Sequence, residues 1–270
     1  MELRVLTEGD LRQALDMPAA IQAVRQAFVA LSGGGARVPV RQRIEGPGAT
    51  LLSMPGTLSA PGSLGAKLVT VAPDNRRRGL PAIHAVVVLL DPTTGVPRAL
   101  LDGEWLTALR LAEEAAGAGV EGVRAVATAA EAIRGAQIVV TATDSSEPVL
   151  DPDALEPTVL INAVGGYRRD MQEVPTVVTA RARVVVDQVE AALREAGDVW
   201  IPCEAGVLRP EELEELGALA ALTGGETPGA EARPGVTLFK SVGNAVQDLA
   251  VAALALERAE ALGLGTVVRG

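Results

Sequence analysis

Residues with reactive side chains are scarce in this sequence. Its 270 residues include one histidine, His84, and one cysteine, Cys203. A single cysteine excludes an internal disulfide and favours a reducing, cytoplasmic setting. A single histidine excludes a metal site built from several histidines, and a Ser–His–Asp hydrolase would depend on His84 alone. We therefore expect no bound metal, and we interpret His84 as a structural strand residue.

Long apolar runs and extended clusters of positive charge are also missing. No stretch reaches the roughly 18–20 apolar residues that a membrane helix needs. The first residues, Met1 to Arg4, lack the apolar segment of a signal peptide. The net charge is −10, whereas phosphate backbones are bound by clustered Lys and Arg. Neither nucleic acid nor a membrane is expected as a partner.

Lysine is rare, with only Lys67 and Lys240 among 24 basic residues. The chain uses arginine for ordinary surface charge. A lysine retained against this bias is a candidate for work that arginine cannot do, because burial can neutralise an ammonium group but not a guanidinium. The alternative is that both lysines are chance remnants.

Two hydrophobic patterns divide the chain. Capping residues at 7–10 and 16–18 predict two helices, and apolar, β-branched runs between 37 and 101 predict strands. This first pattern indicates an α+β unit with an antiparallel or mixed sheet. After Gly117, short apolar runs alternate with helices, which is typical of a parallel, doubly wound sheet.

Individual elements of the second pattern can be given by range. The expected strands cover 123–126, 138–143, 159–166 and 184–187, and helices are expected over 211–223 and 245–262. The fold class is therefore α/β, with a doubly wound sheet plus an α+β unit.

Six segments in order resemble one family. They are residues 38–41, 66–70, 101–110, 161–166, 192–198 and 237–249. Together they are similar to the ornithine cyclodeaminase/mu-crystallin family over nearly the whole chain. The resemblance implies NAD or NADP as cofactor, a small amino or cyclic imino acid as substrate, and a homodimer. It also implies a substrate-binding and dimerisation domain at 1–110 with 241–270, and a Rossmann-like domain at 111–240.

The resemblance assigns roles to residues by position. Arg41 and Arg110 would hold the substrate carboxylate, Lys67 would be the catalytic residue at the reacting carbon, and Val242 would contact substrate. A guanidinium fork matches a carboxylate with two parallel hydrogen bonds, which agrees with these roles; a surface ion pair is the alternative for each arginine. The cofactor-binding positions would be Arg110, Thr143, Ile161, Asn162, Ala163, Val164 and Ser241. For residues 161–164 the alternative is a buried core strand.

The sequence departs from the family after Arg110. A strand, a glycine-rich turn, a helix and a second strand normally follow, yet residues 111–119 resemble only the helix after that second strand. A βαβ unit takes 30 or more residues, and on the order of fifty are absent. The Rossmann-like domain is thus expected to be truncated and to bind dinucleotide more weakly by several kcal/mol, because the turn supplies the pyrophosphate site. Its remaining strands must re-pair or leave an exposed apolar edge.

A second departure concerns the reaction. Cyclodeaminases carry an aspartate directly after the Ala-Val-Gly-Gly segment, where this sequence has Tyr167, and Asp170 lies three residues further on. This favours an NAD(P)-dependent reductase of an imine or keto acid over ornithine deamination. Two alternatives stay open. One is a cofactor-deficient, inactive relative that binds a small carboxylate or a protein, and the other is an altered product of a gene for an ordinary enzyme.

Overall fold

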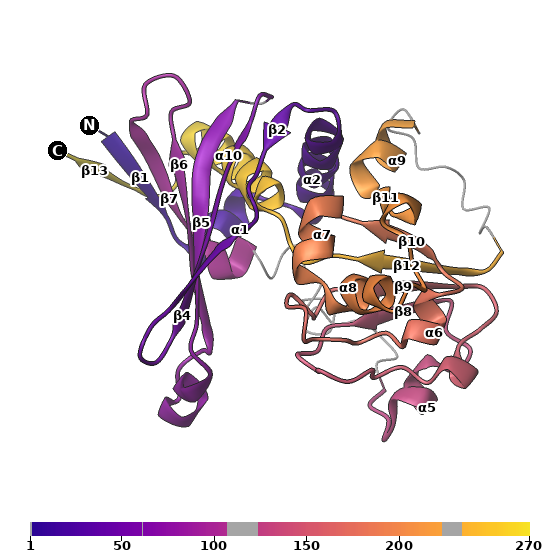
Figure 1. Ribbon diagram of the computed structural model, residues 1–270. Helices are drawn as coiled ribbons and strands as arrows, with labels where there is room; N and C mark the ends of the chain where they lie inside the picture. Colours follow the sequence, from indigo (N-terminus) through magenta and orange to yellow (C-terminus); the bar gives the residue numbers. More distant parts are fainter. Residues whose placement is uncertain (1, 61, 107–123, 223–233) are drawn as a thin grey trace. The chain divides into compact units, whose positions relative to one another are not determined.

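The computed structural model describes residues 2–60, 62–106, 124–222 and 234–270. The chain forms two compact units (Figure 1). Unit 1 comprises Met1–Val123 and Ala245–Gly270, and unit 2 comprises Arg124–Asn244. No helix in the described ranges combines the length and the apolar character needed to cross a membrane.

Unit 1 is built on a mixed sheet in the order β13-β1-β7-β6-β5-β4-β2, with β3 also paired to β4. Strands β1 and β7 run parallel, and the other described pairs are antiparallel. The strands are β1 (Glu2–Leu6), β2 (Ala36–Arg37), β3 (Gln42–Glu45), β4 (Thr50–Leu58), β5 (Ser63–Val71), β6 (Ile83–Leu90), β7 (Pro97–Asp102) and β13 (Thr266–Arg269).

Three helices whose bounds lie within the described residues accompany this sheet, together with the 3-10 turn η1 (Pro73–Arg78), and residues 103–106 are also helical. The three helices are α1 (Glu8–Ala14), α2 (Met17–Ser32) and α10 (Ala245–Leu262). Helix α10 packs against β4, β5 and β6 and also contacts α1 and α2 (Figure 1). Strand β5 alternates between buried and more exposed positions, with Ser63, Gly65, Lys67 and Val69 on its buried face. This alternation is the period-two pattern of a strand with one covered face.

Thr7 and Asp10 begin α1 with a reciprocal capping box, as the sequence pattern predicts. The Asp10 carboxylate accepts hydrogen bonds from the Thr7 N–H at 2.9 Å and from the Thr7 hydroxyl at 2.6 Å. Gly265, which precedes β13, donates its N–H to the same side chain at 3.2 Å. Asp10 therefore stabilises the helix start and also ties the end of the chain to it.

Unit 2 contains a five-stranded sheet in the order β11-β10-β12-β9-β8, and every described pair in it is parallel. Its strands are β8 (Ile138–Thr141), β9 (Val159–Ala163), β10 (Arg183–Val186), β11 (Glu214–Glu215) and β12 (Val236–Lys240). Its helices are α5 (Ala129–Ile133), α6 (Thr176–Thr179), α7 (Val189–Glu195), α8 (Gly197–Glu204) and α9 (Leu216–Leu222), with 3-10 turns η2 (Pro152–Ala154) and η3 (Pro210–Glu212). Its core is rich in Val, Ile, Leu and Ala, as expected for a sheet packed on both faces.

The predicted fold class is confirmed, with a parallel Rossmann-like sheet and a separate mixed sheet. Two local predictions were wrong. Residues 124–126 form no strand, and the helix expected over 211–223 is divided into η3, β11 and α9 in its described part. Strands β1 and β13 were not foreseen, because each is short and is ordered by pairing with distant segments: β13 pairs with β1, and β1 also pairs with β7.

Strand β8 ends the order of the unit 2 sheet within the described part of the chain. Ile138 is 62% exposed and Val140 is 60% exposed, whereas Val139 between them is 5% exposed. One face of this strand is thus apolar and open to solvent. An edge strand of this kind is what loss of the preceding strands is expected to leave.

Replacing Asp10 by Ala is expected to lower the free energy of unfolding by about 1 kcal/mol at neutral pH, because a helix cap is lost. The hydrogen bonds from Thr7 and Gly265 lower the pKa of Asp10 below its ordinary value of 3.8. The carboxylate's contribution is therefore fully present above that value and is lost as the pH falls through the folded-state pKa. Urea unfolding of wild type and D10A at several pH values checks this; a difference that stays constant down to pH ~2 contradicts it.

Candidate functional site

The carboxyl ends of β8, β9 and β12 lie at one edge of the unit 2 sheet, since the strands are parallel. We call the residues that follow these ends, Thr143, Gly165, Gly166 and Ser241, the carboxyl edge of unit 2. Ligands of open α/β sheets bind at this kind of edge. Among the described residues no group of His, Cys, Asp and Glu is arranged to hold a metal.

Glu173 is fully buried and joins the loops that follow β8 and β9. Its Oε1 accepts hydrogen bonds from the Thr143 N–H at 2.6 Å and the Thr143 hydroxyl at 2.9 Å. Its Oε2 accepts from the Gly165 N–H at 2.9 Å and the Gly166 N–H at 3.1 Å. Four donors at the strand ends are thus directed to a carboxylate of the chain itself.

The loop after β9 passes so close to the loop after β8 that only glycine fits at position 165. A Cβ atom at this position would lie 2.2 Å from both the backbone nitrogen and the carbonyl oxygen of Thr143, and 2.6 Å from Glu173 Oε1. Backbone atoms cannot rotate away as a side chain can. Packing around Glu173 and Thr143 therefore explains the glycine at position 165.

Asp187 follows β10 and organises the turn after β12. Its Oδ2 accepts from the Ser241 hydroxyl at 2.8 Å, the Val242 N–H at 3.0 Å and the Gly243 N–H at 3.1 Å. Burial raises the pKa of Asp187, and the hydrogen bonds from Ser241, Gln188, Val242 and Gly243 oppose that rise. The carboxylate holds Ser241 and Val242, both predicted site residues, in one fixed turn.

The predicted cofactor positions on β9 divide by burial. Ile161 and Ala163 are fully buried, whereas Asn162 and Val164 are half-buried. Side chains alternate across a strand, so Ile161 and Ala163 belong to the core and can offer a ligand only backbone atoms. Thr143 is exposed to solvent, although its backbone N–H and its hydroxyl both donate hydrogen bonds to Glu173.

Lys67 lies on the buried face of β5 in unit 1, and it is 3% exposed. Its Nζ is 3.1 Å from Oδ1 of Asp248, which is 2% exposed on α10. An unpaired buried charge is very costly, so each group makes the burial of the other tolerable. Arg41, between β2 and β3, is half-buried, and Arg110 lies outside the described residues.

Sequence reasoning missed Asp248, Glu173 and Asp187 as parts of these sites. Asp248 had a visible signal, because it is an acidic residue in the first turn of a last helix whose early residues are mostly apolar. Two further residues considered from the sequence, His84 and Asp170, form pairs at the protein surface. His84 Nδ1 lies 2.6 Å from Glu104, and Asp170 pairs with Arg168 at 2.8 Å.

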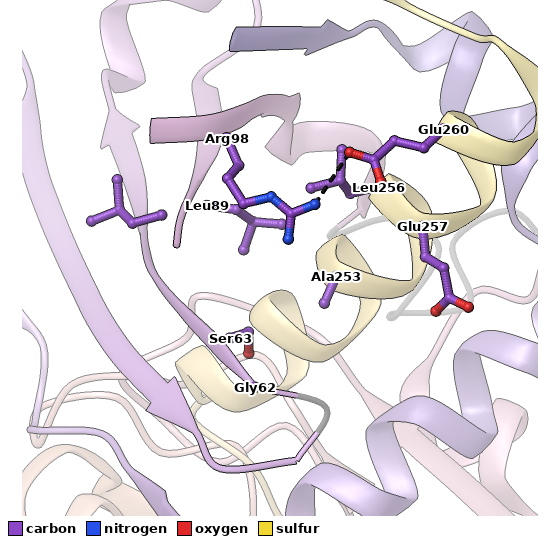
Figure 2. Close-up of a pocket in the computed structure, with 9 residues that line it drawn as sticks. Gly62, Ser63, Leu89, Arg98, Ala253, Leu256, Glu257 and Glu260 are labelled. Atoms are coloured by element: carbon purple, nitrogen blue, oxygen red, sulfur yellow. Dashed lines mark hydrogen bonds and ion pairs between the residues drawn. The ribbon is translucent and has the colours of Figure 1, made fainter. Parts of the chain in front are cut away.

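A cavity of about 230 Å³ lies in unit 1 between the first part of β5, the end of β6 and the later turns of α10 (Figure 2). Arg98 and Glu260 form an ion pair at 3.2 Å on its wall. Ser63 also lines it, and the Ser63 hydroxyl has no hydrogen-bond partner among the described residues. None of the predicted site residues lines this cavity.

The fold and these sites define a class of protein. A parallel Rossmann-like sheet with a structured carboxyl edge is combined with a mixed-sheet unit that carries a buried lysine. The model of the ornithine cyclodeaminase/mu-crystallin family matches residues 1–122 and 112–263. The chain belongs to this family.

Relatives match over nearly their full length. A Delta(1)-pyrroline-2-carboxylate reductase of Bacillus cereus is 32% identical, over 97% of this chain and 98% of the relative. An alanine dehydrogenase of Archaeoglobus fulgidus is 26% identical, over 100% of this chain and 99% of the relative. The solved structure of Thermococcus litoralis Delta(1)-pyrroline-2-carboxylate reductase, in complex with NADH and L-proline, has a TM-score of 0.88 at 29% identity and covers 97% of this chain and 99% of its own.

The comparisons also locate the shortened segment. The family model matches in two pieces that overlap at residues 112–122, directly after Arg110. The alignment with the Bacillus reductase has 323 positions, while 97% of 270 residues is about 262, so about 60 positions are filled by the relative alone. The relatives are thus longer by about one βαβ unit.

Replacing Gly165 by Ala is expected to lower the free energy of unfolding of unit 2 by about 3 kcal/mol, because the new methyl group overlaps the Thr143 backbone. Gly48→Ala is the matched control, since a Cβ there meets no atom within 4 Å. Denaturant unfolding followed by circular dichroism measures both variants. Equal losses in the two would show that the contact with Thr143 is not the cause.

Proposed function

We propose that this chain is an NAD(P)H-dependent reductase of a small cyclic imino acid. The observation that carries the proposal is the buried Lys67–Asp248 pair in unit 1, in a chain that is 32% identical to a Delta(1)-pyrroline-2-carboxylate reductase over almost all of its length. Tyr167, in place of the aspartate of cyclodeaminases, supports reduction of an imine rather than deamination of ornithine. The single cysteine supports a cytoplasmic location.

On the substrate side, unit 1 supplies the residues. Arg41 and Arg110 hold the carboxylate through their guanidinium forks. The Lys67 ammonium donates a proton to the imine nitrogen, while Asp248 keeps Nζ in place from α10. Lys67 is the catalytic residue in this proposal, and Asp248 is a positioning residue. The family resemblance makes Val242 a further substrate-binding position, and this residue belongs to unit 2, in the turn held by Asp187.

On the cofactor side, the carboxyl edge of unit 2 fits the nicotinamide end of a dinucleotide. Asn162 and Val164 are half-buried there, and Thr143 and Ser241 are fixed by buried carboxylates. When bound, NAD(P)H would supply the hydride for the imine carbon, and the Lys67 ammonium would give its proton to the nitrogen, so that the C=N bond would become a C–N bond. The glycine-rich turn for the pyrophosphate is missing from the sequence, so binding is weaker than in longer relatives.

We also propose a homodimer formed through unit 1, because one related solved structure is an archaeal alanine dehydrogenase dimer with bound NAD. The face of the mixed sheet opposite Lys67 supports this. Leu68 pairs with Val86, and Val88 pairs with Leu100, so these four side chains share that face. Leu68 is 37% exposed and Leu100 is 36% exposed.

A second candidate is a binding module that has lost catalysis. The specific observation in its favour is the two-piece family match, which divides at residues 112–122, where the sequence lacks the glycine-rich turn that binds pyrophosphate in dinucleotide-binding sheets. Such a protein would keep the carboxylate-binding residues of unit 1 and bind a small carboxylate without reducing it.

Titration with NADH and with NADPH, followed by nicotinamide fluorescence, separates the two candidates. We expect saturation below the millimolar range, followed by reduction of Delta(1)-pyrroline-2-carboxylate and slower or no deamination of ornithine. Absence of saturation at millimolar cofactor would overturn the reductase proposal. Faster turnover of ornithine than of the imine would overturn the interpretation of Tyr167.

Lys67→Met is expected to lower kcat by about a hundredfold or more, because the proton donor is lost. The affinity for NADH should remain within about twofold, since Lys67 belongs to the substrate side. The variant leaves the Asp248 carboxylate buried without its ammonium, so Lys67→Met with Asp248→Asn serves as the control for stability. If the double variant is stable and retains wild-type kcat, Lys67 is not the proton donor.

A further inference from the structure

We propose that Lys240, Asp198 and Glu173 form a buried charge cluster that positions the carboxyl edge of unit 2. The part of the proposal that concerns the cofactor rests on the proposed function, and the structural part does not. All three side chains are 0% exposed. Lys240 Nζ lies 3.0 Å from Asp198 Oδ2 and 3.9 Å from Glu173 Oε2.

The cluster connects segments that are far apart in the sequence. Lys240 is the last residue of β12, Asp198 lies in the first turn of α8, and Glu173 lies between β9 and α6. Asp198 Oδ1 accepts from the backbone N–H of Glu173 at 2.7 Å and of Val174 at 2.8 Å. Asp198 thus fixes the backbone that carries the Glu173 side chain.

Glu173, whose backbone is held by Asp198, in turn holds the carboxyl edge of unit 2. Through its four hydrogen bonds it holds Thr143 after β8 and Gly165 and Gly166 after β9. The ends of three parallel strands are therefore joined by one set of buried charges, and the loops at those ends keep a common geometry.

Lys240 is the residue that makes this arrangement electrostatically tolerable. The cluster contains two carboxylates and one ammonium, and without Lys240 two buried negative charges would face each other with only backbone N–H groups and the Thr143 hydroxyl as donors. A compact ammonium also suits the space, because a Cβ on Gly166 would lie only 3.4 Å from Nζ. Arginine, the usual cation of this chain, is larger and planar.

The geometry makes Lys240, Asp198 and Glu173 positioning residues and not catalytic ones. They hold Thr143 and the Gly165–Gly166 backbone, which the proposed function places at the nicotinamide end of the cofactor. Loss of the ammonium should therefore loosen this edge before it loosens the rest of the sheet. This differs from a general loss of stability, which would affect all parts of the sheet alike.

Native-state amide hydrogen exchange on the full chain tests the structural part. In Lys240→Met, we expect exchange at Thr143, Gly165 and Gly166 to accelerate at least about tenfold more than exchange at the core amide of Ile161. Arg183→Met is the matched control, because it removes a cation from a half-exposed ion pair with Glu214 in the same sheet. The control should show no selective acceleration at the three edge amides.

Two further variants keep the test decisive if Lys240→Met does not fold. Asp198→Asn keeps the shape of the side chain but removes its charge. Glu173→Gln keeps one acceptor oxygen, so part of the four-donor set loses its partner. Selective acceleration at the edge amides in either variant supports the cluster. Equal acceleration at Ile161 and at the edge, or none in any folded variant, overturns it.

NADH titration of the same variants tests the functional part. We expect Lys240→Met or Asp198→Asn to weaken NADH binding at least about tenfold, with no such effect in Arg183→Met. Unchanged NADH affinity in a variant with a loosened edge would overturn the positioning role. If wild type itself does not bind NADH, the proposed function fails, whereas the exchange measurements still decide whether the cluster holds the edge.

Discussion

The hydrogen bonds that converge on the buried carboxylate of Glu173 are the interaction on which the carboxyl edge of unit 2 depends. Parallel strands leave backbone N–H groups unpaired at their ends, and buried groups of this kind need partners. In many sheets a bound phosphate or carboxylate supplies them. Here Glu173 does so for Thr143, Gly165 and Gly166, so the chain itself sets the geometry of the edge.

Both lysines of this arginine-rich chain are buried in contact with aspartate. Lys67 pairs with Asp248 in unit 1, and Lys240 pairs with Asp198 in unit 2. Each ion pair links a strand to a helix, β5 to α10 and β12 to α8. A small ammonium fits such interiors where a guanidinium does not. Burial against an aspartate gives each lysine a structural reason to be retained, and the catalytic role of Lys67 stays a prediction.

The shortened segment affects the two units unequally. Unit 1 retains the sheet, the last helix and the buried lysine, whereas the unit 2 sheet, as far as the described residues show it, ends at β8 with Ile138 and Val140 exposed. The strands that remain are still parallel and still share one carboxyl edge. Under the proposed function, the nicotinamide end is recognised by segments that are present, whereas the pyrophosphate is recognised less well because a different segment provides its site.

The sequence by itself determined the fold class, the family, the capping box of α1, the bounds of α10 and the place of the missing segment. Each of these features follows from the hydrophobic periodicity of one segment or from the order of residues within it. Only the tertiary structure decided the partners of Glu173, Asp187, Asp198 and Asp248, and which residues of β9 are core. Lys67 and Asp248 are 181 residues apart, and Asp187 and Ser241 are 54 apart. No local pattern encodes such pairs, because sheet order and helix packing bring them together and burial then decides which charges must be matched.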